Sequence, residues 1–267
     1  MVAAMMEDSA QNPHADSRPV VALIQVRMTS TRLPGKVLLD LAGKPALHWM
    51  LERLRRARLI DRIVVATTEL SSDDPVAAFC REQGIDVFRG DEHDVLGRFA
   101  AAAAAFDART VVRLTGDCPM IDPQVVDRVI GRYLEGGLDY CSNYIERSYP
   151  IGLDTEVFSR AVLDRCQREA VSAYAREHVT PLMRDADPEQ PGLSLRRGHV
   201  RHEADFSHIR WTLDTPEDLA LLRRYFDGLP ADFTWQQALA AATRDPSLLV
   251  VSETPEARTL RLHGTPT

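Results

Sequence analysis

Short apolar runs that alternate with amphipathic segments are the main pattern along the first half of the chain. Residues 20–25, 63–67 and 110–114 are rich in Val, Ile, Leu and Ala, which is typical of buried parallel strands. A shorter strand is expected at 86–88. Helical spacing of apolar residues predicts helices at 45–58, 73–83, 95–106 and 123–134. This alternation of strands and helices predicts βαβ units and a mostly parallel sheet.

The pattern is less regular in the second half of the chain. Further strands are expected at 138–142, 152–158 and 209–213. Ser159 is expected to cap a helix, and further helices are expected at 173–184, 216–225 and 234–242. Together these elements predict one α/β domain over residues 20–252, with a sheet between two layers of helices. Residues 1–19 are expected to form a disordered tail and residues 253–267 a flexible one.

Composition narrows the classes of protein that fit this pattern. The formal net charge is −7, which argues against a general nucleic-acid binder. No apolar run approaches the ~20 residues that a membrane-spanning helix needs, so no membrane partner is expected. The start of the chain has neither the basic nor the apolar segment of a signal peptide. The four cysteines form no CxxC pair, which fits a reducing compartment. A soluble cytoplasmic protein is therefore expected.

Polar clusters follow several of the expected strands. They lie at residues 25–36, 67–69, 116–117 and 212–215. In open α/β sheets, ligands bind outside the carboxyl ends of the strands. The pattern therefore predicts that these clusters meet in one active site.

The first cluster is basic and rich in hydroxyl groups. Arg27, Arg32 and Lys36 surround three Ser and Thr residues, and such a loop is suited to binding a chain of phosphates. Lysine is rare here, since Lys36 and Lys44 are the only two among 32 basic residues. The loop has neither the P-loop motif nor the dinucleotide-binding motif GxGxxG. A solvated surface turn is the alternative interpretation.

Two aspartates at strand ends are candidate metal ligands. Asp117 follows Gly116 after the strand at 110–114, and Asp214 follows the strand at 209–213. Mg²⁺ prefers one or two carboxylates together with substrate phosphates and water. Capping or turn roles for both aspartates are the structural alternatives, but the basic loop favours a site that binds a metal and phosphate.

The motifs together resemble those of a known family. QVRMTSTRLPGK at 25–36, GDCP at 116–119 and LDTPEDL at 213–219 are similar to elements of the cytidylyltransferases that make CMP-activated Kdo and sialic acids. VLGRF at 95–99, EHVTP at 177–181 and GLDTE at 152–156 resemble the branch that contains the spore coat polysaccharide protein SpsF. The resemblance covers residues 20 to 228.

The resemblance implies a Rossmann-like nucleotide-diphospho-sugar transferase fold, a homodimer, and Mg²⁺ and CTP as cofactor and cosubstrate. Arg27, Lys36 and Asp117 would be catalytic, and Asp117 and Asp214 would bind the metal. The nucleotide-binding residues would be Arg27, Ser30, Arg32, Lys36, Thr67, Asp94, Arg98 and Thr115. The acceptor-binding residues would be Asn143, Asp154, Glu156, Glu177, His178 and Arg210.

Several acceptor-side residues have structural alternatives. Asp154 and Glu156 could form the solvent face of a strand, His178 could be a satisfied helix residue, and Arg210 could be an ion-pair partner. The acceptor patterns of the Kdo and sialic-acid enzymes are not found between residues 138 and 208. The expected reaction is transfer of CMP from CTP to a sugar acid, with release of pyrophosphate, for surface polysaccharide or glycan synthesis. The alternatives are a phosphonate or other small acid as acceptor, and a non-catalytic nucleotide-binding module.

Overall fold

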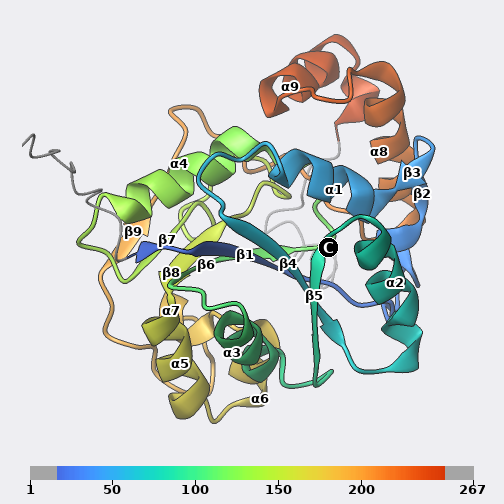
Figure 1. Cartoon of the computed structure of the whole chain (residues 1–267). Coiled ribbons are helices and arrows are strands. Elements are labelled where there is room, and N and C mark those ends of the chain that lie inside the picture. The colour runs from blue at the N-terminus through green and yellow to red at the C-terminus, as the bar shows by residue number, and fades with distance from the viewer. Residues whose placement is uncertain (1–16, 250–267) are drawn as a thin grey trace, which may run out of the picture.

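A seven-stranded, mostly parallel sheet forms the centre of the molecule (Figure 1). The computed structural model describes residues 17–249, so nearly all of the two expected tails lies outside the described residues. The strand order is β5-β4-β1-β6-β8-β7-β9, and β8 is antiparallel to its neighbours β6 and β7. The strands are β1 (Val20–Gln25), β4 (Arg62–Thr68), β5 (Asp86–Gly90), β6 (Thr110–Thr115), β7 (Tyr140–Ser142), β8 (Glu156–Ser159) and β9 (Arg197–His199). A separate two-stranded hairpin consists of β2 (Asp40–Leu41) and β3 (Lys44–Pro45).

Helices cover both faces of the sheet, which gives the expected three layers (Figure 1). One apolar cluster joins the sheet to α1 (Ala46–Leu54), α2 (Asp74–Glu82), α4 (Pro123–Leu134), α8 (Pro216–Gly228) and α9 (Trp235–Arg244). The cluster on the opposite face joins it to α3 (Val95–Ala105), α5 (Arg160–Glu169), α6 (Ala173–His178) and α7 (Pro181–Arg184). Short 3₁₀ helices are η2 (Lys36–Leu38), η3 (Ser71–Asp73) and η4 (Pro246–Leu248).

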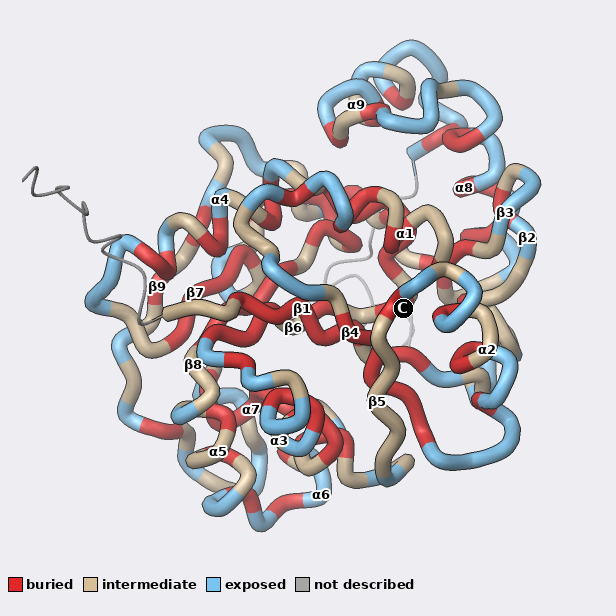
Figure 2. Tube along the Cα trace, viewed as in Figure 1, coloured by how far each residue is buried: buried red, intermediate tan, exposed pale blue. Residues whose placement is uncertain are grey.

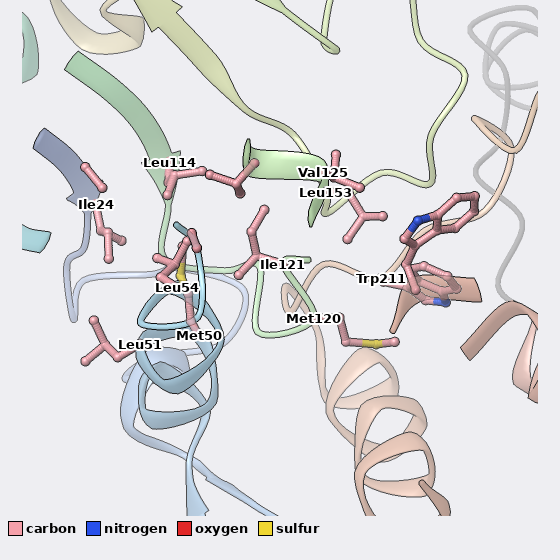
Figure 3. Packing of buried hydrophobic residues seen from close by; sticks show 14 of the residues in the cluster. Ile24, Met50, Leu51, Leu54, Leu114, Met120, Ile121, Val125, Leu153 and Trp211 are labelled. Carbon is pink, nitrogen blue, oxygen red and sulfur yellow. The ribbon is translucent and has the colours of Figure 1, made fainter. Parts of the chain in front are cut away.

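The apolar runs that predict the strands are the most deeply buried segments of the chain (Figure 2). Every residue from Val20 to Ile24 has no exposed surface, because helices pack on both sides of β1. Figure 3 shows how Ile24 and Leu114 from the sheet meet Leu54 of α1. This rigid layer fixes where the strands end, and the polar residues beyond those ends are positioned by it.

Strand β1 lies at the point where the direction of the strand order changes. The chain runs from β1 outward to β4 and β5, and then returns to β6 on the other side of β1. Crevices at such a switch point are the usual ligand sites of open α/β sheets. The segments that leave the carboxyl ends of β1 and β6 are the basic loop and the Gly116–Asp117 turn. Within residues 17–249, no helix combines the length and apolarity that crossing a membrane requires.

Several expected elements of the second half differ in the structure. The helix expected at 173–184 is two helices, because Val179 has a positive φ of 67° and Pro181 cannot donate a backbone hydrogen bond. No strand forms at 209–213, where an isolated parallel bridge joins Ile151 to Arg210. The strand expected at 152–158 begins only at Glu156. Strand β9 was not expected, because its sequence Arg-Gly-His lacks an apolar run.

Candidate functional site

A pocket of about 370 Å³ opens at the carboxyl ends of β1 and β6. Its lining comes from three polar segments, which follow β1, β6 and the bridge at Arg210. Residues at the end of α6 also line it. The lining residues are Gln25, Val26, Arg27, Ser30, Thr31, Arg32, Lys36, Val37, Val95, Thr115, Gly116, Asp117, Glu177, His178 and Asp214. The lining thus includes all three cations of the basic loop and both candidate metal ligands.

The basic loop, residues 26–36, is held to the body of the protein by Asp73. The carboxylate of Asp73 has no exposed surface and accepts hydrogen bonds from Met28 N–H at 2.8 Å and from the Thr67 and Thr68 hydroxyls at 2.8 and 2.6 Å. Burial alone would raise the pKa of Asp73, but these hydrogen bonds lower it below its ordinary value. Gly35 closes the loop with a positive φ of 68°, and its N–H donates to Met28 O.

Lys36 lies between the two candidate metal ligands. Its Nζ is 3.1 Å from Asp117 Oδ2 and 2.8 Å from Asp214 Oδ1. The three side chains are only 14%, 26% and 16% exposed, respectively. Burial lowers the pKa of Lys36, but the two carboxylates outweigh this effect and raise it. For Asp214 the effect of burial has the opposite sign and raises the pKa. Lys36 and the nearby arginines outweigh burial and lower the pKa of Asp214 overall. Lys36 therefore carries a charge and neutralises part of the carboxylate pair.

The two aspartates meet because the backbone joins their segments. Leu213 N–H donates to Asp117 O at 2.8 Å, which places Asp214 beside the turn after β6. A capping box of Thr215 and Asp218 then starts α8, and Asp218 Oδ2 also accepts from Asp214 N–H. Gly116 also lets the turn after β6 lie against the segment that follows β1, since a Cβ there would lie 2.8 Å from Val26 Cγ2.

The carboxylate pair fits a divalent cation that also binds phosphates. Asp117 and Asp214 supply two hard oxygen ligands, as Mg²⁺ prefers, while the phosphates and water would complete the coordination. Among residues 17–249, no group of three or more acidic, His or Cys side chains could form a closed metal cage. The residues present therefore fit a site that shares its metal with a substrate.

Three residues expected near the nucleotide do not line the pocket. Thr67 is fully buried and donates its hydroxyl to Asp73. Asp94 caps α3 through Gly97 N–H, and it pairs with Arg176 at 3.3 Å. Arg98 is 2% exposed, and its Nε and Nη2 atoms have no hydrogen-bond partner within the described chain. Such buried donors are costly unless a ligand or water uses them.

The residues expected to bind the acceptor divide into two groups. Glu177 and His178 line the pocket, whereas the others lie outside its lining. Asn143 is 1% exposed, and its side-chain amide donates to Leu153 O and accepts from Thr155 N–H, which joins the segment after β7 to the segment before β8. Arg210 is an ion-pair partner of Asp214 at 3.3 Å and of Asp218. Asn143 and Arg210 thus have clear structural tasks.

Asp154 and Glu156 are counterions of arginines. Glu156 is 3% exposed, contacts Arg113, and accepts a hydrogen bond of 2.6 Å from Tyr140. Its burial raises its pKa, but Arg113 and Arg184 lower it overall. Asp154 pairs with Arg147 at 2.5 Å, yet burial keeps its pKa above the ordinary value. Neither residue lies on the solvent face of a strand, which excludes that alternative interpretation.

Sequence comparison agrees with this geometry. A family model described as cytidylyltransferase matches residues 21–239 of the chain. The chain belongs to the cytidylyltransferase family.

Relatives and a solved structure support the same family and fold. The chain is 33% identical to the spore coat polysaccharide biosynthesis protein SpsF of Bacillus subtilis, over 85% of the chain and 95% of that protein. It is 30% identical to a 3-deoxy-manno-octulosonate cytidylyltransferase of Anaeromyxobacter sp. (strain Fw109-5), over 76% of the chain and 94% of that enzyme. A cytidylyltransferase structure from Leptospira borgpetersenii has a TM-score of 0.81 and 32% identity, and the match covers 86% of the chain and 96% of that structure. The expected Rossmann-like fold and the expected family are confirmed.

This cytidylyltransferase also has charged residues beside the pocket that the motifs did not indicate. Arg113 lies in β6 opposite Glu156 of β8, and its Nη2 approaches the pocket residue Gln25 at 3.4 Å. Arg147 and Arg184 lie farther along the same row of charges. An arginine within the apolar run 110–114 was the one sequence signal that could have indicated a buried ion pair.

Proposed function

We propose that the protein transfers CMP from CTP to a sugar-acid acceptor and releases pyrophosphate. The observation that carries this proposal is the position of Lys36, within 3.1 Å of both Asp117 and Asp214 in a pocket lined by Arg27 and Arg32. A cationic loop opposite a carboxylate pair suits a triphosphate with its magnesium ion. The family supports CTP as donor, and the name of the 3-deoxy-manno-octulosonate cytidylyltransferase supports a sugar acid as acceptor. The name of SpsF supports a role in polysaccharide biosynthesis.

The basic loop would bind the triphosphate. Arg27, Arg32 and Lys36 neutralise negative charge, and this charge grows on the leaving pyrophosphate as the bond to the α-phosphorus breaks. Ser30 would donate its hydroxyl to a phosphate oxygen. Lys36 would exchange one of its carboxylate contacts for a phosphate oxygen.

Asp117 and Asp214 would hold magnesium, which when bound polarises the phosphates and aligns them for attack. The acceptor oxygen attacks the α-phosphorus in line and pyrophosphate leaves. Most of the catalysis is therefore positioning and electrostatic stabilisation. Among the titratable side chains that line the pocket, the imidazole of His178 is the one best suited to act as a general base. Its burial, together with the charges of Arg113 and Arg184, lowers its pKa, although Glu177 opposes this.

The cytosine base would lie near Thr115 at the end of β6 and near Asp94 and Arg98 at the start of α3. The unpartnered Nε and Nη2 of Arg98 are donors, and cytosine offers acceptors at its carbonyl oxygen and ring nitrogen. Thr67 would act through Asp73, which holds the loop. Asn143, Asp154, Glu156, Glu177, His178 and Arg210 would form or support the acceptor side. A cytoplasmic homodimer stays a prediction.

The test measures pyrophosphate release by the full chain with each of four nucleoside triphosphates, with and without Mg²⁺. The acceptor panel contains 3-deoxy-manno-octulosonate, N-acetylneuraminate and a small phosphonate. We expect release only with CTP, Mg²⁺ and a sugar acid. Asp117→Asn should abolish it, whereas the control Asp164→Asn should retain it, since Asp164 lies on α5, where it pairs with Arg160, and does not line the pocket. Preference for another nucleotide, or full activity of Asp117→Asn, would refute the assignment.

A further inference from the structure

A row of alternating charges extends from the pocket into the loop between β7 and β8. Arg113 bonds Glu156, Glu156 lies 3.7 Å from Arg184, and Arg147 pairs with Asp154. None of the three arginines is needed to bind CTP in the function proposed above. Their side chains are 12%, 13% and 26% exposed, in the order Arg113, Arg184, Arg147. Gathering three guanidinium groups at this depth is costly unless anions compensate them.

Tyr144 joins two of these arginines. The guanidinium carbon of Arg147 lies 4.2 Å from the centroid of the Tyr144 ring, and that of Arg184 lies 4.6 Å from it. Stacking on an aromatic ring fixes the plane of a guanidinium group but uses none of its N–H donors. Tyr144 therefore orients both guanidinium groups and leaves their donor edges available.

Most of these donor edges have no partner within residues 17–249. Arg184 makes one side-chain hydrogen bond, from Nε to Thr180 Oγ1 at 3.1 Å, and its distance to Glu156 exceeds hydrogen-bond range. Arg147 donates from Nη1 to Asp154. The buried Nε of Arg113 also lacks a partner. Three positive charges face two carboxylates, so one more negative charge would balance the row.

The row reaches the pocket where the acceptor must bind. Arg113 contacts Gln25, and the charges of Arg113 and Arg184 act on His178, so both arginines lie close to pocket-lining residues. At the other end, Asp154 lies close enough to Asp117 for their charges to interact. An anion at Arg184 and Arg147 would thus lie beside the carboxylate pair but away from the triphosphate-binding loop.

We propose that Arg147 and Arg184, oriented by Tyr144, bind the carboxylate of the acceptor. This inference rests on the proposed nucleotidyl transfer and adds the group by which the acceptor is recognised. A carboxylate accepts paired N–H donors from guanidinium groups and carries the single negative charge that the row lacks. A phosphonate dianion carries two negative charges, one more than the row lacks. Glu156 and Asp154 then hold the arginines rather than the acceptor.

The test compares acids with their uncharged methyl esters. Calorimetry measures binding of 3-deoxy-manno-octulosonate, N-acetylneuraminate, both esters and the small phosphonate to the full chain. The chain is saturated with CTP and Mg²⁺ in calcium-free buffer, at a temperature where turnover is negligible. We expect at least one acid to bind at least about tenfold more tightly than its ester, as the loss of a charge-assisted hydrogen-bond pair implies. Arg184→Gln should abolish that preference while leaving CTP affinity unchanged. Arg147→Lys, which retains the charge but loses the fork, should reduce it.

Matched measurements separate the outcomes. Arg165→Gln replaces an exposed arginine of α5 and should behave like the wild type, and thermal unfolding of each variant identifies any that fail to fold. Arg184→Gln should fold, because Glu156 keeps Arg113 and Tyr140. Equal affinity for acid and ester, no binding of either acid at millimolar concentration, preference for a phosphonate, or an unchanged preference in Arg184→Gln would each overturn the inference. Failure of CTP itself to bind with Mg²⁺ would instead overturn the proposed function.

Discussion

Replacing Lys36 by Met should increase the affinity of the protein for a divalent cation when no nucleotide is present. In the structure, the ammonium group occupies the space between Asp117 and Asp214, at 3.1 and 2.8 Å. A metal ion that binds these carboxylates must first displace it. In the nucleotide complex Lys36 can move to a phosphate, but without nucleotide it can move only to water.

The size of this effect follows from the contacts. Each hydrogen bond between charged groups contributes about 1.5–3 kcal/mol net. Because Lys36 is 14% exposed and its ammonium can regain hydration, we take the loss for both contacts together as about 2 kcal/mol. At about 1.4 kcal/mol for each factor of ten, this corresponds to roughly 30-fold tighter binding of the metal by Lys36→Met. CTP affinity should fall, since a phosphate contact is lost.

Calorimetric titration with Mg²⁺ and Mn²⁺, in the absence of nucleotide, measures this effect. Lys44→Met is the matched control, because Lys44 is exposed on the short strand β3 and should leave metal binding unchanged. Equal or weaker metal binding by Lys36→Met would contradict the reasoning. It would mean that the ammonium group helps to form the site rather than compete for it.

Three further results are expected. Gly116→Ala should lower the free energy of unfolding by about 1–3 kcal/mol and reduce turnover, because the new Cβ would overlap Val26. Chemical denaturation measures the stability, and pyrophosphate release measures the turnover. Unchanged stability would argue against this close approach. Asp73→Asn should weaken CTP binding, which calorimetry measures, and should lower the free energy of unfolding by about 2–4 kcal/mol. The reason is that a carboxylate with several hydrogen bonds loses its charge. CTP affinity equal to that of the wild type would show that Asp73 does not hold the loop. Because folding lowers the pKa of Asp73, its stabilising contribution is present above its unfolded pKa of about 3.9 and is lost as the pH falls through the lower folded value. Acid unfolding of Asp73→Asn should therefore depend less on pH than that of the wild type.

The sequence predicts which residues of the basic loop and of the Gly116–Asp117 turn line the pocket, because these segments directly follow continuous buried runs, whereas Thr67, Asp94 and Arg98 lie outside the lining. Buried runs such as residues 20–25 fix the strands, and the motifs after them line the pocket. The acceptor side proposed above depends on tertiary contacts between short irregular segments. Nothing local to Arg147 or Tyr144 indicates that a loop after β7 places them beside Arg184 of α7. Likewise, Val179 shows no sequence signal for its positive φ, which ends α6 early.

The hydrogen bond from Leu213 to Asp117 has a consequence for how the protein acquires activity. Lys36 and Asp214 are 178 residues apart in sequence, and their contact depends on the docking of one of the last segments onto the completed sheet. A chain emerging from the ribosome can form β1, β4 and β6 well before that segment is synthesised. Such an intermediate has the cationic loop and Asp117 but lacks the second carboxylate. The metal binding proposed for the carboxylate pair would therefore report the final step of folding, and a chain released too early would be inert rather than active with altered specificity.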